Sequence, residues 1–405
     1  YKPNDYGETW TKITTGIAEN DFTRVIREDP ARRGLLYAGT ETGVHVSGDD
    51  GEHWQTLKLN LPVVPVHDLV IKDSDLVAAT HGRSFWILDD LSPLRQLSDE
   101  VREARVHLFP PRPFIRFLSS GGFGHHVTPG TNYRYSGAFV VAYRQQEKPT
   151  GQKVDKYLDA GQNPPNGVLV HYNLQEKPAG EVTLSFLDAG GKEIKAFSSE
   201  EKKQEQAKPE GTKTGGKEKE DKSKEPRVPK EAGANRFVWD TRYPEPVKIE
   251  GYEDSQNYLE GVVAPPGTYQ VRLKIGDQTY TASFQIAKDP GIAATQEDLQ
   301  TQFALLQAIQ NKVSTTHSAV NTLRDIRKQV EDWERRTRHK SRSSTLLRSY
   351  VPSDDLQGEG WEVHETIVTT GAQIQKKLAA IEEELVQVKV KDQLDILDNP
   401  IKLSG

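Results

Sequence analysis

Ser47-Gly48-Asp49-Asp50-Gly51-Glu52-His53-Trp54 is the stretch that decides how the first part of this chain folds. An Asp in this position can accept hydrogen bonds from nearby backbone amides, and Gly takes the left-handed backbone of a tight turn at little cost. The Trp supplies a large apolar surface that can pack beneath such a turn. We therefore predict a hairpin turn with four structural residues: Ser47, Asp49, Gly51 and Trp54.

A second copy of this stretch stands near the start of the chain. Asn4-Asp5-Tyr6-Gly7-Glu8-Thr9-Trp10 aligns with it at a spacing of 44 positions, and Pro3 stands where the later copy has Ser. The structural residues of this copy are Asp5, Gly7, Thr9 and Trp10.

The strands between the two turns also repeat. Leu36-Tyr37-Ala38-Gly39-Thr40 aligns with Leu76-Val77-Ala78-Ala79-Thr80, which lies 40 positions later. A period of about 40–50 residues with four short strands is typical of a β-propeller blade, and a closed propeller needs about four to eight blades. Only about two are present, so we expect the missing blades to precede Tyr1 in the same protein or to belong to a partner chain.

The remaining β segments predict two further parts. Residues 1–100 are expected to be the last blades of the propeller, and the Pro-, Gly- and aromatic-rich residues 101–165 a connector. Residues 166–290 contain six or seven short alternating strands, which predict a β-sandwich. Within it, residues 199–232 are nearly all charged or polar, which predicts a disordered loop.

The C-terminal part is predicted to be a helical hairpin over residues 295–390. Apolar residues recur at three- or four-residue steps over 295–335 and again over 361–388, so the two stripes are expected to pack antiparallel. Thr295-Gln296-Glu297-Asp298 fits a capping box at the start of the first helix. Residues 391–405 are expected to be a truncated tail. The fold class is therefore mainly β with α.

Composition excludes several classes of function. The chain of 405 residues carries a net charge of −6, which gives no electrostatic case for nucleic acid. No apolar run approaches the roughly 20 residues of a membrane span. There is no Cys, which excludes disulfides, thiolate metal sites and Cys nucleophiles. The absence of Met and the start at Tyr1 suggest a mature or truncated piece.

Thr80-His81-Gly82-Arg83-Ser84-Phe85-Trp86 is the best candidate for a binding site. His81, Arg83 and Trp86 could contact a ligand, since an Arg can pair with a carboxylate. The alternative is a strand-connecting turn in which Arg83 bonds loop carbonyls and the aromatic residues pack between blades, and we favour it.

Histidines elsewhere give no metal site. Gly124-His125-His126 has no third ligand at a suitable spacing. His317 is expected to be a polar break in the seam of the helical hairpin. We therefore expect no metal and no cofactor, and we assign no catalytic residue.

These stretches carry a resemblance to a known family. The two turn motifs fit the Asp-box, or BNR repeat (bacterial neuraminidase repeat), and Ala79–Asp90 and Phe237–Pro244 strengthen the likeness. The chain resembles secreted bacterial Asp-box proteins with a sortilin-like β-propeller, some of them described as glycosyl hydrolases. Ala264–Tyr269 is similar to the last hairpin of the immunoglobulin-like domain of flagellar hook-capping proteins, which implies that the sandwich over residues 166–290 is an immunoglobulin-like β-sandwich. The resemblance implies a secreted, periplasmic or cell-surface location.

Three hypotheses for the function remain open at this point. The first is a non-catalytic binding or scaffold module that recognises a protein or a glycan. The second is a fragment of a sialidase-like glycosyl hydrolase whose active site lies on missing N-terminal blades. The third is a structural component of a cell-surface assembly. Sialidases need an arginine cluster, a Tyr/Glu pair and a further acid drawn from several blades, so we lean against catalysis by this chain.

Overall fold

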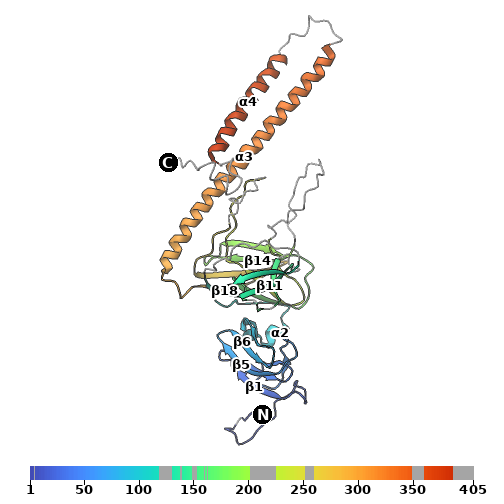
Figure 1. Cartoon of the computed structure of the whole chain (residues 1–405), viewed down its shortest axis with the longest axis vertical. Coiled ribbons are helices and arrows are strands. Elements are labelled where there is room, and N and C mark those ends of the chain that lie inside the picture. Colours follow the sequence, from blue (N-terminus) through green and yellow to red (C-terminus); the bar gives the residue numbers. More distant parts are fainter. Residues whose placement is uncertain are drawn as a thin grey trace. The chain divides into compact units, whose positions relative to one another are not determined.

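The chain is mainly β, with several antiparallel sheets and a C-terminal pair of contacting helices (Figure 1). It divides into two compact units, each made of two stretches: Tyr1–Thr241 with Pro266–Ala293, and Arg242–Pro265 with Ala294–Gly405. This computed structural model describes residues 1–3, 5–117, 130–136, 139–147, 153–158, 160–161, 163–200, 225–250, 260–348 and 360–385.

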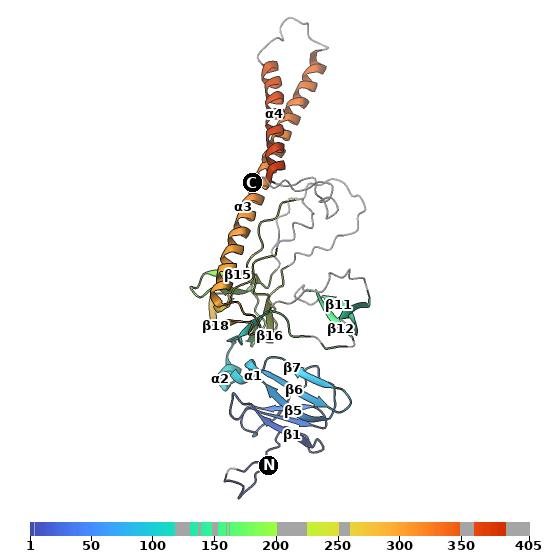
Figure 2. The ribbon, with the colours of Figure 1, turned by 60° about the vertical axis from the view of Figure 1, so that its left-hand side comes forward.

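The first unit begins with two antiparallel sheets, each built from consecutive strands. The first sheet has the order β1-β2-β3-β4 and the second has the order β5-β6-β7, whose strands lie side by side in Figure 2. The strands are β1 (Thr23–Glu28), β2 (Leu36–Thr40), β3 (Val44–Ser47), β4 (Gln55–Thr56), β5 (Val66–Lys72), β6 (Asp75–Thr80) and β7 (Phe85–Leu88). The two repeated segments Leu36–Thr40 and Leu76–Thr80 are confirmed as strands, β2 and β6.

A shared apolar core joins these two sheets. Tyr37 of the first sheet is fully buried with Leu69 and Leu76 of the second. Arg27 of β1 crosses between the sheets, donating to the Leu69 carbonyl at 2.9 Å and pairing with Asp68 at 2.6 Å. Successive side chains of a strand point to opposite faces. The residues on either side of Tyr37 accordingly pack on the other face of the first sheet, where a separate cluster contains Leu36, Ala38, Trp54 and the half-buried Ile17.

The predicted connector contributes strands to later sheets. Two short helices, α1 (Ser92–Gln96) and α2 (Asp99–Glu103), follow β7. Strand β8 (Val106–Phe109) then pairs with β13, and β9 (Phe114–Arg116) pairs in parallel with β18. The sequence did not predict these strands because three prolines between Pro110 and Pro113 interrupt the apolar alternation.

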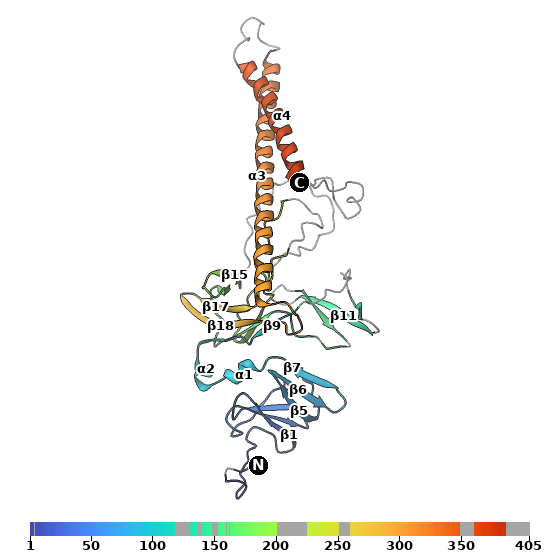
Figure 3. The ribbon, with the colours of Figure 1, turned by 90° about the vertical axis from the view of Figure 1, so that its left-hand side faces the viewer.

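Three further sheets complete the first unit. Their orders are β10-β11-β12, β16-β13-β8 and β15-β14-β17-β18-β9, and Figure 3 shows β9 beside β18. Their remaining strands are β10 (Asn132–Ser136), β11 (Phe139–Glu147), β12 (Lys153–Tyr157), β13 (Val168–Leu174), β14 (Val182–Leu187), β15 (Glu193–Ser198), β16 (Gly233–Trp239), β17 (Gly267–Ile275) and β18 (Gln278–Lys288).

An aromatic core lies between the sheet of β13 and the sheet of β14. The rings of Phe186 and Trp239 stack with their centroids 4.4 Å apart, and Phe284 meets both rings edge-on. All three residues are buried. Aromatic pairs of this kind stabilise by about 0.5–1.5 kcal/mol beyond their buried area, so this cluster is the principal link between the two sheets.

The predicted disordered loop is ordered at its C-terminal flank. Within 199–232, residues 201–224 lie outside the described residues. Val228 is buried and its amide donates to the Ser198 carbonyl at 3.0 Å. The hydroxyl of Tyr172 donates to the Pro229 carbonyl. Val228 is an apolar residue in an otherwise charged stretch, and its burial beside the strands explains why this flank is ordered.

The second unit contains two long helices. They are α3 (Gln296–Arg348) and α4 (Gly360–Leu385), which contact each other. The capping box is confirmed, since the Asp298 amide donates to Oγ1 of Thr295 at 3.1 Å and the Thr295 amide donates back to Asp298 at 2.8 Å. Helix α3 continues past the predicted end at 335. Residues 386–405, including the predicted tail, lie outside the described residues.

An extended segment, residues 242–250, runs along α3 and was expected to belong to the sandwich. A row of polar side chains on α3 binds its backbone. Nδ1 of His317 lies 2.6 Å from the Val247 carbonyl, and Asn321 both accepts from the Glu250 amide at 3.0 Å and donates to the Lys248 carbonyl at 2.9 Å. His317 therefore does not interrupt the seam between the helices, as predicted, but holds this segment.

None of the helices that the structure describes has the length and apolar character needed to cross a membrane.

Candidate functional site

The turn between β6 and β7 carries the residues predicted to bind a ligand. Gly82 and Ser84 both have positive φ, at 77° and 61°, and the Ser84 carbonyl accepts from the Thr80 side chain at 2.6 Å. His81 and Arg83 are exposed on this turn, whereas Trp86 is half-buried. The structure therefore brings the three predicted residues to one turn, but Trp86 points into the protein.

Contacts within the turn match the alternative interpretation. Nε1 of Trp86 donates to the Arg83 carbonyl at 3.0 Å, and the His81 amide donates to the Pro65 carbonyl at 2.9 Å. The rings of His81 and His67 stack with their centroids 5.1 Å apart. These bonds define a strand-connecting turn, and they leave the exposed Arg83 guanidinium as the group best placed to meet a charged partner.

An exposed apolar face lies beside this turn on the sheet β5–β6–β7. Phe85 and Ile87 of β7 are 72% and 59% exposed, and Val70 of β5 is 51% exposed. Val77 of β6 is paired with Val70 on one side and with Ile87 on the other, so these three residues form one row across the sheet. Exposed apolar side chains scattered singly are ordinary, whereas these residues form a contiguous apolar row on one sheet face.

A groove runs along the edge strand of the same sheet. It is lined by Leu59 and Leu61, which follow β4, and by Trp86 and Leu88 of β7. In the part of the chain that the structure describes, β7 has a strand partner on one side only. An edge strand of this kind presents unpaired backbone groups to whatever lies beside it.

The two Asp-box turns have the same local geometry. Asp5 and Asp49 each accept a hydrogen bond from the amide four residues later, at 2.8 and 2.9 Å. Positive φ values recur at the same two places in each turn: Tyr6 and Gly7 in the first, Asp50 and Gly51 in the second. The predicted turn chemistry is therefore confirmed in both copies.

The tryptophans of the two boxes differ. Trp54 is 4% exposed and its Nε1 donates to the Ile13 carbonyl at 2.9 Å, so it packs as predicted. Trp10 lies against Gly7 of its own turn but is 60% exposed, so it lacks the burial of Trp54. The difference follows from the neighbours, because residues 13–17 cross Trp54 and bring Gly16 so close that a Cβ there would lie 2.1 Å from the Trp54 carbonyl oxygen.

A buried ionic cluster lies where β7 leads into α1, and the sequence did not predict it. The Asp90 carboxylate is 1% exposed, accepts from the Ser92 hydroxyl at 2.6 Å and lies 3.2 Å from Nε2 of His171 on β13. Asp75 pairs with Arg112 at 3.0 Å and accepts from the Asp90 amide at 2.9 Å. No spacing in the sequence signals these pairs, since Asp90, which follows β7, and His171 of β13 lie far apart along the chain.

The two adjacent acids of this cluster have opposite pKa shifts. Burial and the nearby Asp75 carboxylate raise the pKa of Asp89, although Arg236 acts against this shift. Burial also disfavours the charged form of Asp90, but His171 and the hydrogen bonds from Ser92 outweigh it and lower the pKa of Asp90. Because the carboxylate of Asp90 is shielded from water, we assign the cluster a role in joining β7 and α1 to β13, not in binding a substrate.

Among the described residues, one group of side chains lies close enough together to hold a metal ion. Asp49, Glu52 and His53 lie close together and are all exposed. Oδ2 of Asp49 lies 2.8 Å from Nδ1 of His53, so this carboxylate is already part of the Asp-box turn. Gly124-His125-His126 lies outside the described residues.

Comparison with known proteins gives no family: no family model, no curated protein and no solved structure matches the chain.

Proposed function

We propose that this chain is a non-catalytic binding and scaffold module whose first two sheets are successive blades of an Asp-box β-propeller. The observation that carries the proposal is the exposed face of β5–β6–β7, with Val70, Val77, Phe85 and Ile87. Covering apolar surface gains about 25 cal/mol per Å², so a protein surface of matching shape would be held there. A polypeptide partner, rather than a glycan, fits an apolar face of this kind.

The repeat of 40 residues supports a further sheet as that partner. Leu36 and Ala38 lie on the face of the first sheet that packs on Trp54, and their counterparts Leu76 and Ala78 lie on the face of the second sheet that packs on the first. Tyr37 lies on the opposite face of its strand and contacts the second sheet. Its counterpart Val77 therefore belongs to the face that, by the same relation, would contact a third sheet.

The number of strands agrees with this interpretation. The first sheet has four strands and the second has three in the described part of the chain. A blade has four strands, so a strand beside β7 would complete the second sheet. The missing strand and the missing sheet would come from another part of the same protein or from a partner chain.

The other parts of the proposal rest on resemblance and on the aromatic core. We assign the sheets around Phe186 and Trp239 to an immunoglobulin-like β-sandwich that serves as a spacer module. The likeness to secreted Asp-box proteins favours a periplasmic, secreted or cell-surface location. The exposed turn with His81 and Arg83 would lie at the rim of the docked face and supply polar contacts to the same partner.

Site-specific photo-crosslinking tests this function. Phe85 is replaced by benzoylphenylalanine in cells that produce the protein, and crosslinked peptides are identified by mass spectrometry. We expect Phe85 to crosslink to a strand with alternating apolar residues, while the same probe at Lys192, in the exposed turn between β14 and β15, does not.

Two results would overturn the proposal. One is crosslinking at Phe85 no greater than at Lys192. The other is turnover of any member of a panel of fluorogenic glycosides by this chain, which would restore the hydrolase hypothesis.

A further inference from the structure

The helical hairpin carries an apolar stripe beside the seam in which α3 and α4 meet. On α4 the seam residues follow steps of three and four: Val368, Gly371, Gln375, Leu378 and Glu382. Ile367, Ile374 and Ile381 lie seven residues apart, each directly before a seam residue, and are 37%, 38% and 45% exposed. We call these three residues the isoleucine stripe.

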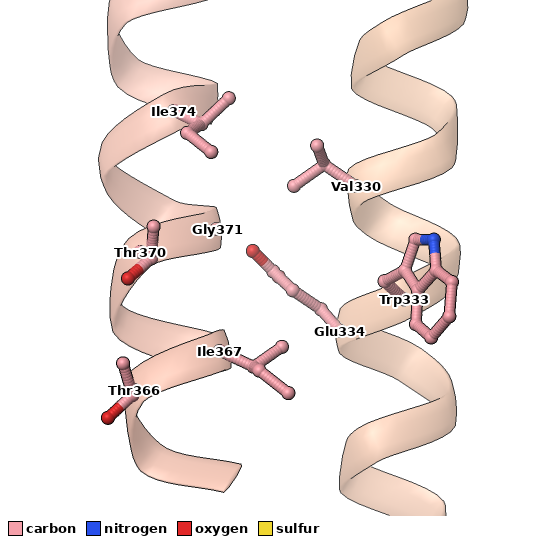
Figure 4. A pocket seen from close by; sticks show the side chains of 8 residues that line it. All are labelled: Val330, Trp333, Glu334, Thr366, Ile367, Thr370, Gly371 and Ile374. Atoms are coloured by element: carbon pink, nitrogen blue, oxygen red, sulfur yellow. The ribbon is translucent and has the colours of Figure 1, made fainter. Parts of the chain in front are cut away.

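Helix α3 places apolar residues at the equivalent position. Ile326 and Trp333 are also seven residues apart and precede the inward-facing Arg327 and Glu334; they are 39% and 65% exposed. In an antiparallel pair, equivalent flanking positions of the two helices lie on the same side of the seam. Figure 4 shows Ile367 and Ile374 pointing from α4 toward α3. Together with Trp333 they line a cavity of about 320 Å³.

The other side of the hairpin is polar. From the seam, Glu382 pairs with Arg324 at 2.7 Å and with Arg327 at 3.3 Å. These residues border a second cavity on this side, which is lined mainly by charged residues. One side of the seam is thus apolar on both helices and the other is charged. Two seam positions per seven residues suffice for a pair of helices, whereas a third apolar position is typical of helices packed in a larger bundle.

Charge along the hairpin indicates what covers the stripe. Residues 335–348 of α3 contain six Lys or Arg residues and no acid. The first two of these basic residues, Arg335 and Arg336, pair with Asp332. At the far end of α4, Glu383 and Glu384 are exposed acids beside Glu382, which is already paired with Arg324 and Arg327. Position 335 lies eleven residues beyond Arg324, the partner of Glu382, or about 16 Å along the helix at 1.5 Å per residue.

We propose that a second copy of this chain covers the isoleucine stripe, forming an antiparallel four-helix bundle. An antiparallel arrangement places the basic end of each hairpin beside the acidic end of the other, whereas a parallel arrangement would place like charges together. A twofold axis brings the same patch of both copies into contact, and a stripe with equal spacing on both sides of Ile374 is self-complementary about such an axis. This inference is independent of the function proposed above.

The oligomeric state of the full chain tests the inference. We expect light scattering to give twice 45.4 kDa for the unchanged chain. Ile374→Lys should weaken association by about 100-fold or more, because it buries an unpaired charge. The matched control Gln373→Lys adds the same charge at an exposed position on the same helix and should leave the dimer intact. Circular dichroism checks that both variants remain helical.

Cysteine crosslinking tests the orientation, and the natural chain has no Cys to interfere. Under oxidation, Ile374→Cys should form a covalent dimer. Ile367→Cys and Ile381→Cys should crosslink when the two variants are mixed, but neither should crosslink to itself. Self-crosslinking at all three positions would overturn the antiparallel pairing. A natural chain that stays at 45.4 kDa up to about 100 µM, well above the micromolar range of ordinary specific interfaces, would overturn the inference itself.

Discussion

At the scale of single residues, Asp90 combines two constraints. Its φ is 68°, in the left-handed region, and its carboxylate is buried against Ser92 and His171. Asn tolerates this backbone nearly as well as Asp, so Asp90→Asn removes the charge and leaves the turn intact. A buried charged acceptor contributes more than a neutral one, since hydrogen bonds to charged groups stabilise by about 1.5–3 kcal/mol.

We therefore expect Asp90→Asn to lower the free energy of unfolding by about 2 kcal/mol at pH 7. The pKa of Asp90 is lower in the folded chain than its ordinary value of 3.8. The ionised carboxylate therefore stabilises the folded chain at pH values above 3.8. This contribution is lost as the pH falls through the pKa of the folded state. In urea unfolding, the difference in the free energy of unfolding between the variant and the natural chain should be large at pH 7 and become smaller below about pH 4.

Asp73→Asn is the matched control for this experiment. Asp73 also has a positive φ, at 54°, but its side chain is 83% exposed. We expect a change within about 0.5 kcal/mol, as for most surface substitutions. If Asp90→Asn lowers the free energy of unfolding by the same amount at pH 3 as at pH 7, lost packing and not lost charge causes the effect.

The sequence predicted residue roles only where they are local. The bonds that define the Asp-box turns and the Thr295 cap join residues at most four positions apart, so their spacing is visible in the sequence. The contact of Asp90 with His171 depends on how β7 and β13 are brought together. The burial of Trp54 but not of Trp10 likewise depends on a segment passing over one turn alone.

At the scale of elements, side chains of α3 bind the backbone of an extended segment that pairs with no strand of a sheet. Ser314, His317 and Asn321 follow one another at three- and four-residue steps, so they lie on one face. Each meets a backbone group of residues 247–250. Helical polar residues in such a row replace the ladder partners that an extended segment would find in a sheet.

Asn321→Leu tests this element. The change keeps helix propensity but removes one acceptor and one donor, so the Glu250 amide loses its partner. We expect the segment to open more easily by about 2 kcal/mol, or roughly 30-fold in the hydrogen-exchange rate at Glu250. Asn311→Leu, at an exposed position on the same helix, should leave that rate unchanged. Equal rates in both variants would mean that Asn321 does not hold the segment.

Elements were predicted well where their apolar period is clear. The strands of the first two sheets and both helices have such a period, and the structure contains them. The last part of α3 was missed because the apolar stripe ends near Trp333, although the Arg-rich stretch that follows is a good helix former. Residues 242–250 were misassigned because a segment held by side chains on α3 has the same short apolar pattern as a strand.

At the scale of the whole molecule, the chain passes between the two units three times. It leaves the first unit after Thr241, returns at Pro266 to form β17 and β18, and leaves again at Ala294. The first unit nevertheless contains every strand of the sheet to which β14 belongs, because β17 and β18 pair only with strands of that unit. Its core therefore does not need α3 or α4 to be complete.

A chain that ends at Ala293 should separate the contributions of the two units. We expect it to keep its β circular dichroism and the hydrogen-exchange protection of β17, because the partners of β17 are β14 and β18. Residues 247–250 should lose protection, since α3 supplies the side chains that bind them. Loss of protection throughout β17 and β18 would instead show that the sheets depend on the helices, and that the two units fold as one.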